Sequence, residues 1–181
     1  MTLWREDLAR YGRKGLLQVP GAWIICPGFA VACYYRLYHR LRRGGFVGYW
    51  LASLLWRHVV TAFGCYISPL ARIGGGLQLS HPVSVVIGDG VVIGRNVTVY
   101  QNVTIGIADA ATPGYPVVED DVTIYAGATI IGPVTIGRGA TIAAHALVNR
   151  DVPPFTTAIG APARIVHKSQ PAPLTEEALA K

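Results

Sequence analysis

The sequence repeats every six residues from Ile67 to Pro153, and this period constrains the fold more than any other feature. Two extra residues, Val85 and Val86, follow the third repeat, and a segment without the period, 105–117, separates the sixth from the seventh. The twelve repeats begin with a large aliphatic residue, at Ile67, Ile73, Leu79, Ile87, Ile93, Val99, Val118, Ile124, Ile130, Ile136, Ile142 and Val148. Position five is Leu, Val or Ala, position two is often Gly, and positions three and four are mostly polar, Gly or Pro.

Strands this short cannot each bury an apolar face alone, so they must stack into a solenoid with one continuous core. Position one supplies the large interior side chain, and position five supplies a smaller inward one. Gly, Asn and Asp in the turns tolerate backbone angles that β-branched residues resist. The sequence therefore predicts a mainly β fold, a parallel β-helix of hexapeptide repeats, over residues 65–167.

The residues before the repeats have the apolar spacing of helices. Helices are expected over 2–14, 28–43 and 46–62, with an irregular piece or a short helical turn over 20–27. In the last helix, the side chains expected to face inward are Trp50, Leu51, Leu54, Leu55 and Val59. The open first coil of a solenoid needs covering, so residues 1–64 are predicted to form a helical cap. Residues 168–181 are polar and Pro-rich and are expected to be a flexible tail.

The formal charge of +6 comes from 16 basic and 10 acidic residues, and the excess gathers at 36–43, whereas the repeats are nearly balanced. Nucleic-acid binding would require a basic face with interleaved aromatic residues and is not expected. A solvated helix face, an anionic membrane surface and a phosphate-bearing ligand remain open for this run. The uncharged stretch 16–35 is long enough to span a bilayer, but Pro-Gly pairs at 20–21 and 27–28 interrupt it. Two short segments packed against the solenoid are expected there, with a membrane-inserted hairpin as the alternative.

Three cysteines are present, Cys26, Cys33 and Cys65, and none of them forms a CxxC spacing. Cysteines in this arrangement are typical of small apolar residues in a reducing compartment. A cytoplasmic protein is therefore expected.

Several segments have a distinctive sequence beyond the period itself. They are Gly76–Gly88 (GLQLSHPVSVVIG), Asn102–Gly106 (NVTIG), Gly160–Val166 (GAPARIV) and, upstream, Pro27–Phe29 and Tyr35–His39. Through them the chain resembles the serine O-acetyltransferases, hexapeptide-repeat acyltransferases, over roughly residues 27–167. The resemblance implies a left-handed parallel β-helix of triangular section with an N-terminal α-helical cap, and an enzyme that transfers acetyl from acetyl-CoA to a hydroxyl group.

The resemblance assigns the general base to His81. An alkyl hydroxyl is a poor nucleophile near neutral pH, and an imidazole can remove its proton as the oxygen attacks the thioester. Backbone N–H groups beside the thioester would hold the developing oxyanion. No covalent intermediate is implied, so no Ser-His-Asp triad is expected.

The sequence departs from the family where the acceptor would bind. Acidic residues are usual in the family at the positions of Tyr66 and Ser80, and a second histidine at that of Tyr115. A zwitterionic amino acid needs paired charges when it is buried. We therefore expect these three residues to bind a neutral hydroxyl, such as one on a sugar. L-serine is the alternative acceptor, and a solenoid scaffold without activity is the alternative function.

The family resemblance also implies where coenzyme A lies, in a groove between neighbouring solenoids of a homotrimer or a multiple of a trimer. By position, the residues beside it would be Gly106, Ala126, Gly127, Ala144, Arg164 and Lys168. Zinc sites of related solenoid carbonic anhydrases use three histidines from adjacent coils. His81 and His145 are several coils apart, so no metal site is expected.

Overall fold

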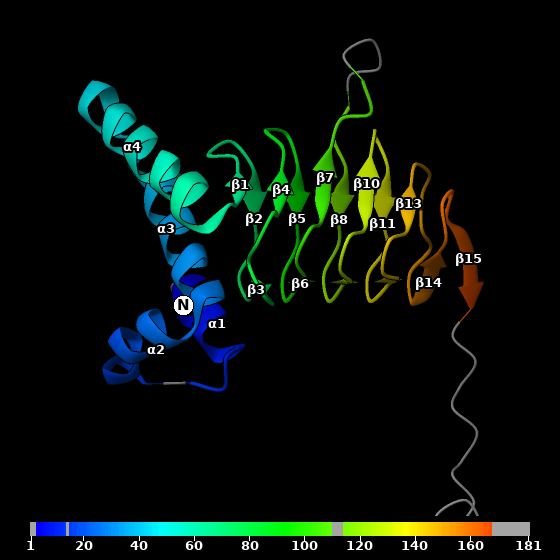
Figure 1. Cartoon of the computed structure of the whole chain (residues 1–181), viewed down its shortest axis with the longest axis horizontal. Helices are drawn as coiled ribbons and strands as arrows, with labels where there is room; N and C mark the ends of the chain where they lie inside the picture. Colours follow the sequence, from blue (N-terminus) through cyan, green and yellow to red (C-terminus); the bar gives the residue numbers. More distant parts are fainter. Residues whose placement is uncertain (1–2, 14, 110–113, 168–181) are drawn as a thin grey trace, which may run out of the picture.

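Short strands stacked along one axis form a prism, and the helices lie together at one end of it (Figure 1). This computed structural model describes residues 3–13, 15–109 and 114–167. The predicted tail, 168–181, lies outside the described residues.

The cap contains the helices α1 (Leu3–Ala9), η1 (Leu16–Gln18), α2 (Val19–Ile25), α3 (Pro27–Leu41) and α4 (Gly45–Phe63). The expected helix over 2–14 is shorter than predicted, and the segment at 20–27 is more regular than predicted, because Pro20 fits the first turn of α2. No helix in the described part of the chain combines the length and the apolar character that crossing a bilayer requires.

The prism has three faces, each a parallel sheet. The first contains β1 (Tyr66–Ile67), β4 (Val86–Ile87), β7 (Thr104–Gly106), β10 (Thr129–Ile131) and β13 (Leu147–Val148). The second contains β2 (Arg72–Ile73), β5 (Val92–Ile93), β8 (Val117–Val118) and β11 (Thr135–Ile136). The third contains β3 (Gln78–Leu79), β6 (Thr98–Val99), β9 (Thr123–Ile124), β12 (Thr141–Ile142), β14 (Thr156–Ile159) and β15 (Arg164–His167), of which only the last pairs antiparallel.

The large first residues of the repeats pair with one another from coil to coil, as the period predicts. On the first sheet the ladder is Ile67, Ile87, Ile105, Ile130 and Val148, and all five are fully buried. The position-five residues are also buried, for example Val91, Val97 and Val122. Because each strand sends alternate side chains to opposite faces, one inward residue per strand is enough to build the core.

Three details of the predicted register are wrong. Ile105 pairs with Ile87 in the regular ladder, so the interruption begins later than predicted. The six-residue register predicts Val83 as the inward residue at position five, but Val83 is exposed and Val85 is buried in its place. The two extra residues therefore lie within the turn before Val85, not after it. Val152 pairs with Ile136 at a first position, because the last coil is shorter than the others.

Helix α3 fastens the cap to the first coil. The hydroxyls of Tyr35 and Tyr38 donate to the carbonyls of Ala71 and Ile67, each at 2.7 Å. Burial raises the pKa of Tyr35 to about 12, so its hydroxyl remains a donor. Backbone carbonyl groups at the open edge of the first coil, which have no neighbouring coil, thus accept hydrogen bonds from buried side chains of the cap.

The predicted inward face of α4 is wrong in its first half. Trp50, Leu51 and Leu54 are exposed, whereas the small residues Gly48 and Ala52 are buried against α3. A side chain at Gly48 would overlap the Leu41 carbonyl, so only a residue without a Cβ allows the two helices to approach this closely. The larger side chains therefore point away from α3.

Gly28 permits a similarly close contact between α3 and the prism. A Cβ at this position would overlap the Leu79 carbonyl oxygen and lie 2.6 Å from the Tyr11 hydroxyl. Gly28→Ala should therefore destabilise the protein by about 1–3 kcal/mol, since overpacking forces the backbone to shift. Urea denaturation would measure this. Gly21→Ala within α2 is the control, because its nearest neighbour is Arg13 Nη1 at 3.7 Å, and it should be neutral or slightly stabilising.

Candidate functional site

His81 lies in the turn that joins β3 to β4, at the corner between the third and first sheets. Its backbone is left-handed, with φ of 59°, and its side chain is exposed. The Val83 N–H donates to the His81 carbonyl at 2.7 Å, which closes a tight turn around Pro82. Left-handed residues recur in the turns of this prism, since Asn96, Asn102 and His145 also have positive φ, so the backbone of His81 has the ordinary geometry of these turns.

The turn is also held from the start of the first coil. The Cys65 thiol donates to the Pro82 carbonyl at 3.0 Å, and burial raises the pKa of this thiol, so it keeps its proton. Cys65 thus fixes the turn that carries His81. Cys65 forms no disulfide in the described residues, and neither do Cys26 and Cys33, which are half-buried.

A hollow of about 290 Å³ opens beside His81 between the cap and the prism. Its lining consists of Tyr11, Cys26, Pro27, Gly28, Leu79, Ser80, His81 and Pro82. The Tyr11 hydroxyl donates to the Leu79 carbonyl at 3.4 Å and accepts from the Leu79 N–H at 3.0 Å. Burial raises the pKa of Tyr11, so its hydroxyl stays protonated. Sequence reasoning missed Tyr11, because nothing in its own segment distinguishes it.

The predicted acceptor residues do not all meet in one protomer. Ser80 adjoins His81 and lines the same hollow. Tyr66 begins β1, directly after Cys65, and its ring packs edge-on against Trp56 at 5.2 Å between centroids. Tyr115 lies at another corner of the prism, where its ring covers Gly88 and Gly90 between β4 and β5.

The corner that carries His81 continues along the prism through the following coils. Gln101, Ala126 and Ala144 occupy its later turns, at about 5 Å per coil. Gln101 Oε1 is buried and has no hydrogen-bond partner among the residues described. A buried acceptor without a partner is costly, which makes this atom a candidate to receive an N–H of a bound molecule. The six-residue period alone does not identify Gln101 as a site residue, because it predicts neither a polar side chain nor its burial at this turn.

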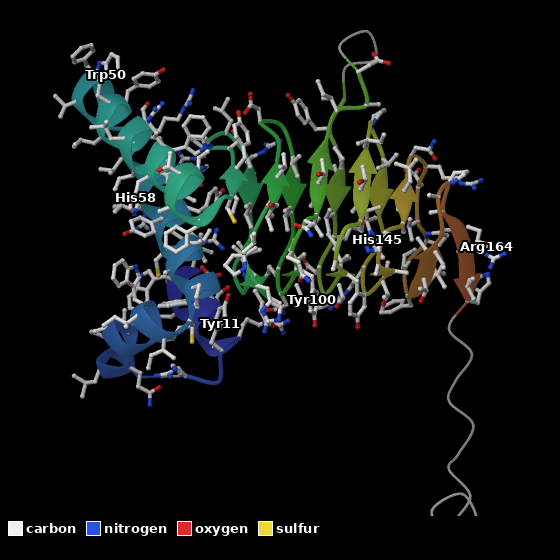
Figure 2. The ribbon with its side chains drawn as sticks, viewed as in Figure 1. Tyr11, Trp50, His58, Tyr100, His145 and Arg164 are labelled. Carbon is white, nitrogen blue, oxygen red and sulfur yellow. The ribbon has the colours of Figure 1, made fainter. Side chains whose placement is uncertain are left out.

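Aromatic side chains flank this line of turns. The rings of Tyr100 and Tyr125 stack at 5.1 Å between centroids, and Figure 2 shows Tyr100 on the edge of the prism. The His145 ring fills the space beside Gly127, where a Cβ would overlap it. The backbone of Gly127 is also left-handed, with φ of 70°, so both the backbone and the His145 ring disfavour a side chain there.

The remaining predicted coenzyme residues are more scattered. Gly106 ends β7, and a Cβ there would have no neighbour within 4 Å, so its surroundings are open. Arg164 is exposed on β15 at the far end of the prism (Figure 2). Lys168 lies outside the described residues. The described residues contain no group of three or more His, Cys, Asp or Glu side chains placed to hold a metal ion.

Comparison with known proteins gives one family. Residues 115–150 match the model of the bacterial transferase hexapeptide, six repeats. Serine acetyltransferase of Buchnera aphidicola is 37% identical over 143 residues, which are 78% of this chain and 54% of the relative. The chain spans about half the length of the curated relatives that it matches.

Solved structures agree with this match. Soybean serine acetyltransferase complexed with serine is 36% identical, with a TM-score of 0.80, over 91% of this chain and 68% of that one. A serine acetyltransferase in complex with CoA is 33% identical, with a TM-score of 0.79, over 91% and 68%. The predicted left-handed β-helix with N-terminal helices is confirmed. The chain belongs to the serine acetyltransferase family of hexapeptide-repeat proteins.

Proposed function

We propose that the protein is an O-acetyltransferase that uses acetyl-CoA as donor and His81 as general base. The observation that carries this proposal is the exposed His81 side chain beside a hollow between cap and prism. His81 would take the proton from the acceptor hydroxyl as its oxygen attacks the thioester carbon. The carbon–sulfur bond then breaks, and the imidazolium returns the proton to the departing thiolate.

The line of turns beyond His81 supports a path for the donor. Ala126 and Ala144 are small, so an extended arm could lie close to the backbone, and the unpartnered Gln101 Oε1 would accept one of its amide N–H groups. Arg164 lies toward the far end, where its guanidinium would meet phosphate oxygens. A solved relative in complex with CoA belongs to the same family, which supports acetyl-CoA as the donor.

L-serine is the better-supported acceptor. The relatives are named for serine, and one solved neighbour is a complex with serine. The expectation of a sugar, drawn from Tyr66, Ser80 and Tyr115, receives no support from these proteins. A neutral hydroxyl remains the second candidate, because His81 is the only ionisable side chain besides Tyr11 and Cys26 that lines the described hollow.

A site shared between copies of the chain would account for the position of Tyr115. Within one protomer Tyr115 and His81 lie at different corners, so only a neighbouring chain could bring the two corners together. We therefore propose that the protein works as a homotrimer with sites at the seams between chains. Closed cyclic symmetry gives each site the same pair of corners.

The acceptor is tested by following release of free coenzyme A thiol. With L-serine as acceptor, we expect faster release than with homoserine or a nucleotide-linked sugar. Faster release with the sugar would reverse the choice of acceptor. A calorimetric titration with coenzyme A separates an enzyme from a scaffold, since a scaffold without a donor site would give no binding heat.

A further inference from the structure

The outer end of the helical cap carries a group of exposed apolar side chains. They come from the first half of α4 and from α3, and are Leu37, Phe46, Val47, Trp50, Leu51 and Leu54. We call this group the cap tip. Phe46 is 78% exposed and Leu54 is 64% exposed, which is unusual for large apolar residues grouped in one place. Figure 2 shows Trp50 at the free end of α4, away from the prism.

Among the described residues, no segment covers the cap tip. The opposite face of α4, with Gly48, Ala52 and Val59, is already buried against the rest of the cap. Farther along the helix, the outward positions are polar or basic, as at Arg57 and His58. The apolar surface therefore ends halfway along α4, and it faces outward only at the end that projects from the molecule.

Three arginines lie close to the cap tip along the chain. Arg40, Arg42 and Arg43 lie at the end of α3 and in the turn to α4, and all three side chains are exposed. The Arg42 guanidinium lies 5.9 Å from the centre of the Tyr49 ring. No ion pair involves these three arginines in the part of the chain that the structure describes, in contrast to Arg36, which Asp7 binds.

The charge of the whole cap has the same sign. The sequence has no Asp or Glu between Asp7 and Asp89. Residues 1–64 contain nine basic and two acidic residues, a net charge of +7, whereas the chain as a whole is +6. The excess positive charge of the protein therefore resides in the cap, and the rest of the chain has a charge of −1.

We propose that the cap tip docks on an anionic lipid surface. Trp and Phe side chains prefer the interface between headgroups and acyl chains, and arginines beside them attract lipid phosphates. Arg40 lies beside Leu37 of the cap tip, and Arg43 is in the turn that leads to Phe46, so basic and apolar residues are neighbours at this end of the cap. Arg40 and Arg43 also line a hollow of about 290 Å³ together with Trp4 of α1 and Ile73 of the first coil.

Charge argues against a second copy of the chain as the occupant. Two cap tips in contact would bring two sets of arginines together, and the cap offers only Glu6 and Asp7 as acids. Both carboxylates are already paired, with Arg95 and Arg36. Like charges without partners oppose such an interface, whereas an anionic bilayer neutralises them.

Vesicle sedimentation with the full chain tests the proposal. The protein should pellet with phosphatidylcholine vesicles that contain about one third phosphatidylglycerol, and much less with phosphatidylcholine alone. Raising the salt concentration should weaken binding, since headgroup attraction is screened. The double variant Phe46→Ser, Trp50→Ser should bind about tenfold more weakly or worse, and so should Arg40→Gln with Arg43→Gln.

Phe155→Ser is the matched control, because Phe155 is an aromatic residue that is 63% exposed at the other end of the prism. It should bind vesicles as the parent protein does. Equal binding of parent and cap-tip variants, equal binding to neutral vesicles, or no binding at all would overturn the proposal. Dissociation of a larger assembly by the Phe46 and Trp50 substitutions in sedimentation velocity, without a change in vesicle binding, would overturn it in favour of a contact between copies. Thiol release without vesicles should be unchanged in the variants, which separates this proposal from acetyl transfer.

Discussion

His81→Asn should lower the rate of coenzyme A thiol release by about two orders of magnitude or more, the usual contribution of a general base. Asparagine tolerates the left-handed backbone at this position, where φ is 59°, so the turn should keep its shape. The amide cannot take the hydroxyl proton, so the loss should appear in turnover while the affinity for coenzyme A stays near that of the parent. Steady-state kinetics and a calorimetric titration would measure the two quantities separately.

His58→Asn serves as the control for this substitution. His58 is an exposed histidine of α4 that packs against the rings of Tyr34 and Phe63, and it does not line the hollow at His81. Its variant should turn over like the parent protein. Unchanged turnover in His81→Asn would remove the imidazole from the mechanism, although the family assignment would stand.

The parallel β-helix was predictable because its core depends on one large aliphatic residue in every six. Ile67, Ile87 and Ile105 pair in register because every coil must place a large aliphatic side chain at the same height of the core. The irregular places were not predictable from the period. Val83 and Val85 are equally apolar, and only the path of the turn around His81 decides which of them is buried.

The packing of the cap shows a different limit of sequence reasoning. A helix with apolar residues on several sides has no unique inward face, and size alone favours Trp50 and Leu54 as the inward residues of α4. In the structure, the close approach of α3 selects Gly48 and Ala52 instead. Small residues thus determined the contact, and the apolar residues left outside form the cap tip.

The candidate site was predictable only in part, because its residues come from distant segments. His81 stands out through the insertion around it, and Ser80 through its adjacency. Tyr11 reaches the site from the N-terminal segment through hydrogen bonds to Leu79, a contact at a separation of 68 residues. Tyr115 fills a different corner of the same protomer, so its predicted role at the acceptor site depends on the homotrimer that we propose.

Asp7→Asn should cost about 3–5 kcal/mol in the free energy of unfolding, the range expected when a buried ion pair loses one partner. Asp7 is fully buried, and its carboxylate accepts from Arg36 at 3.0 and 3.1 Å and from the Leu77 N–H at 2.9 Å. Arg36 also donates to the carbonyls of Ile73 and Gly74, so this one pair joins α1, α3 and the first coil. An asparagine would leave the Arg36 guanidinium, whose side chain is only 11% exposed, without a counter-charge. Urea denaturation would measure the loss.

Glu6→Gln is the control for Asp7→Asn, because Glu6 also pairs with an arginine, at 2.9 Å, but the side chain of that partner, Arg95, is 58% exposed. Its loss should cost at most about 1 kcal/mol, as for other pairs open to solvent. Equal costs for the two variants would show that burial of the Asp7–Arg36 pair is not what fastens the cap. A double variant, Asp7→Asn with Arg36→Met, should recover part of the stability, since it removes both charges together. Because Tyr11 follows α1 directly and bonds to Leu79, loosening α1 should also slow thiol release at His81 even though neither substituted residue contacts that hollow.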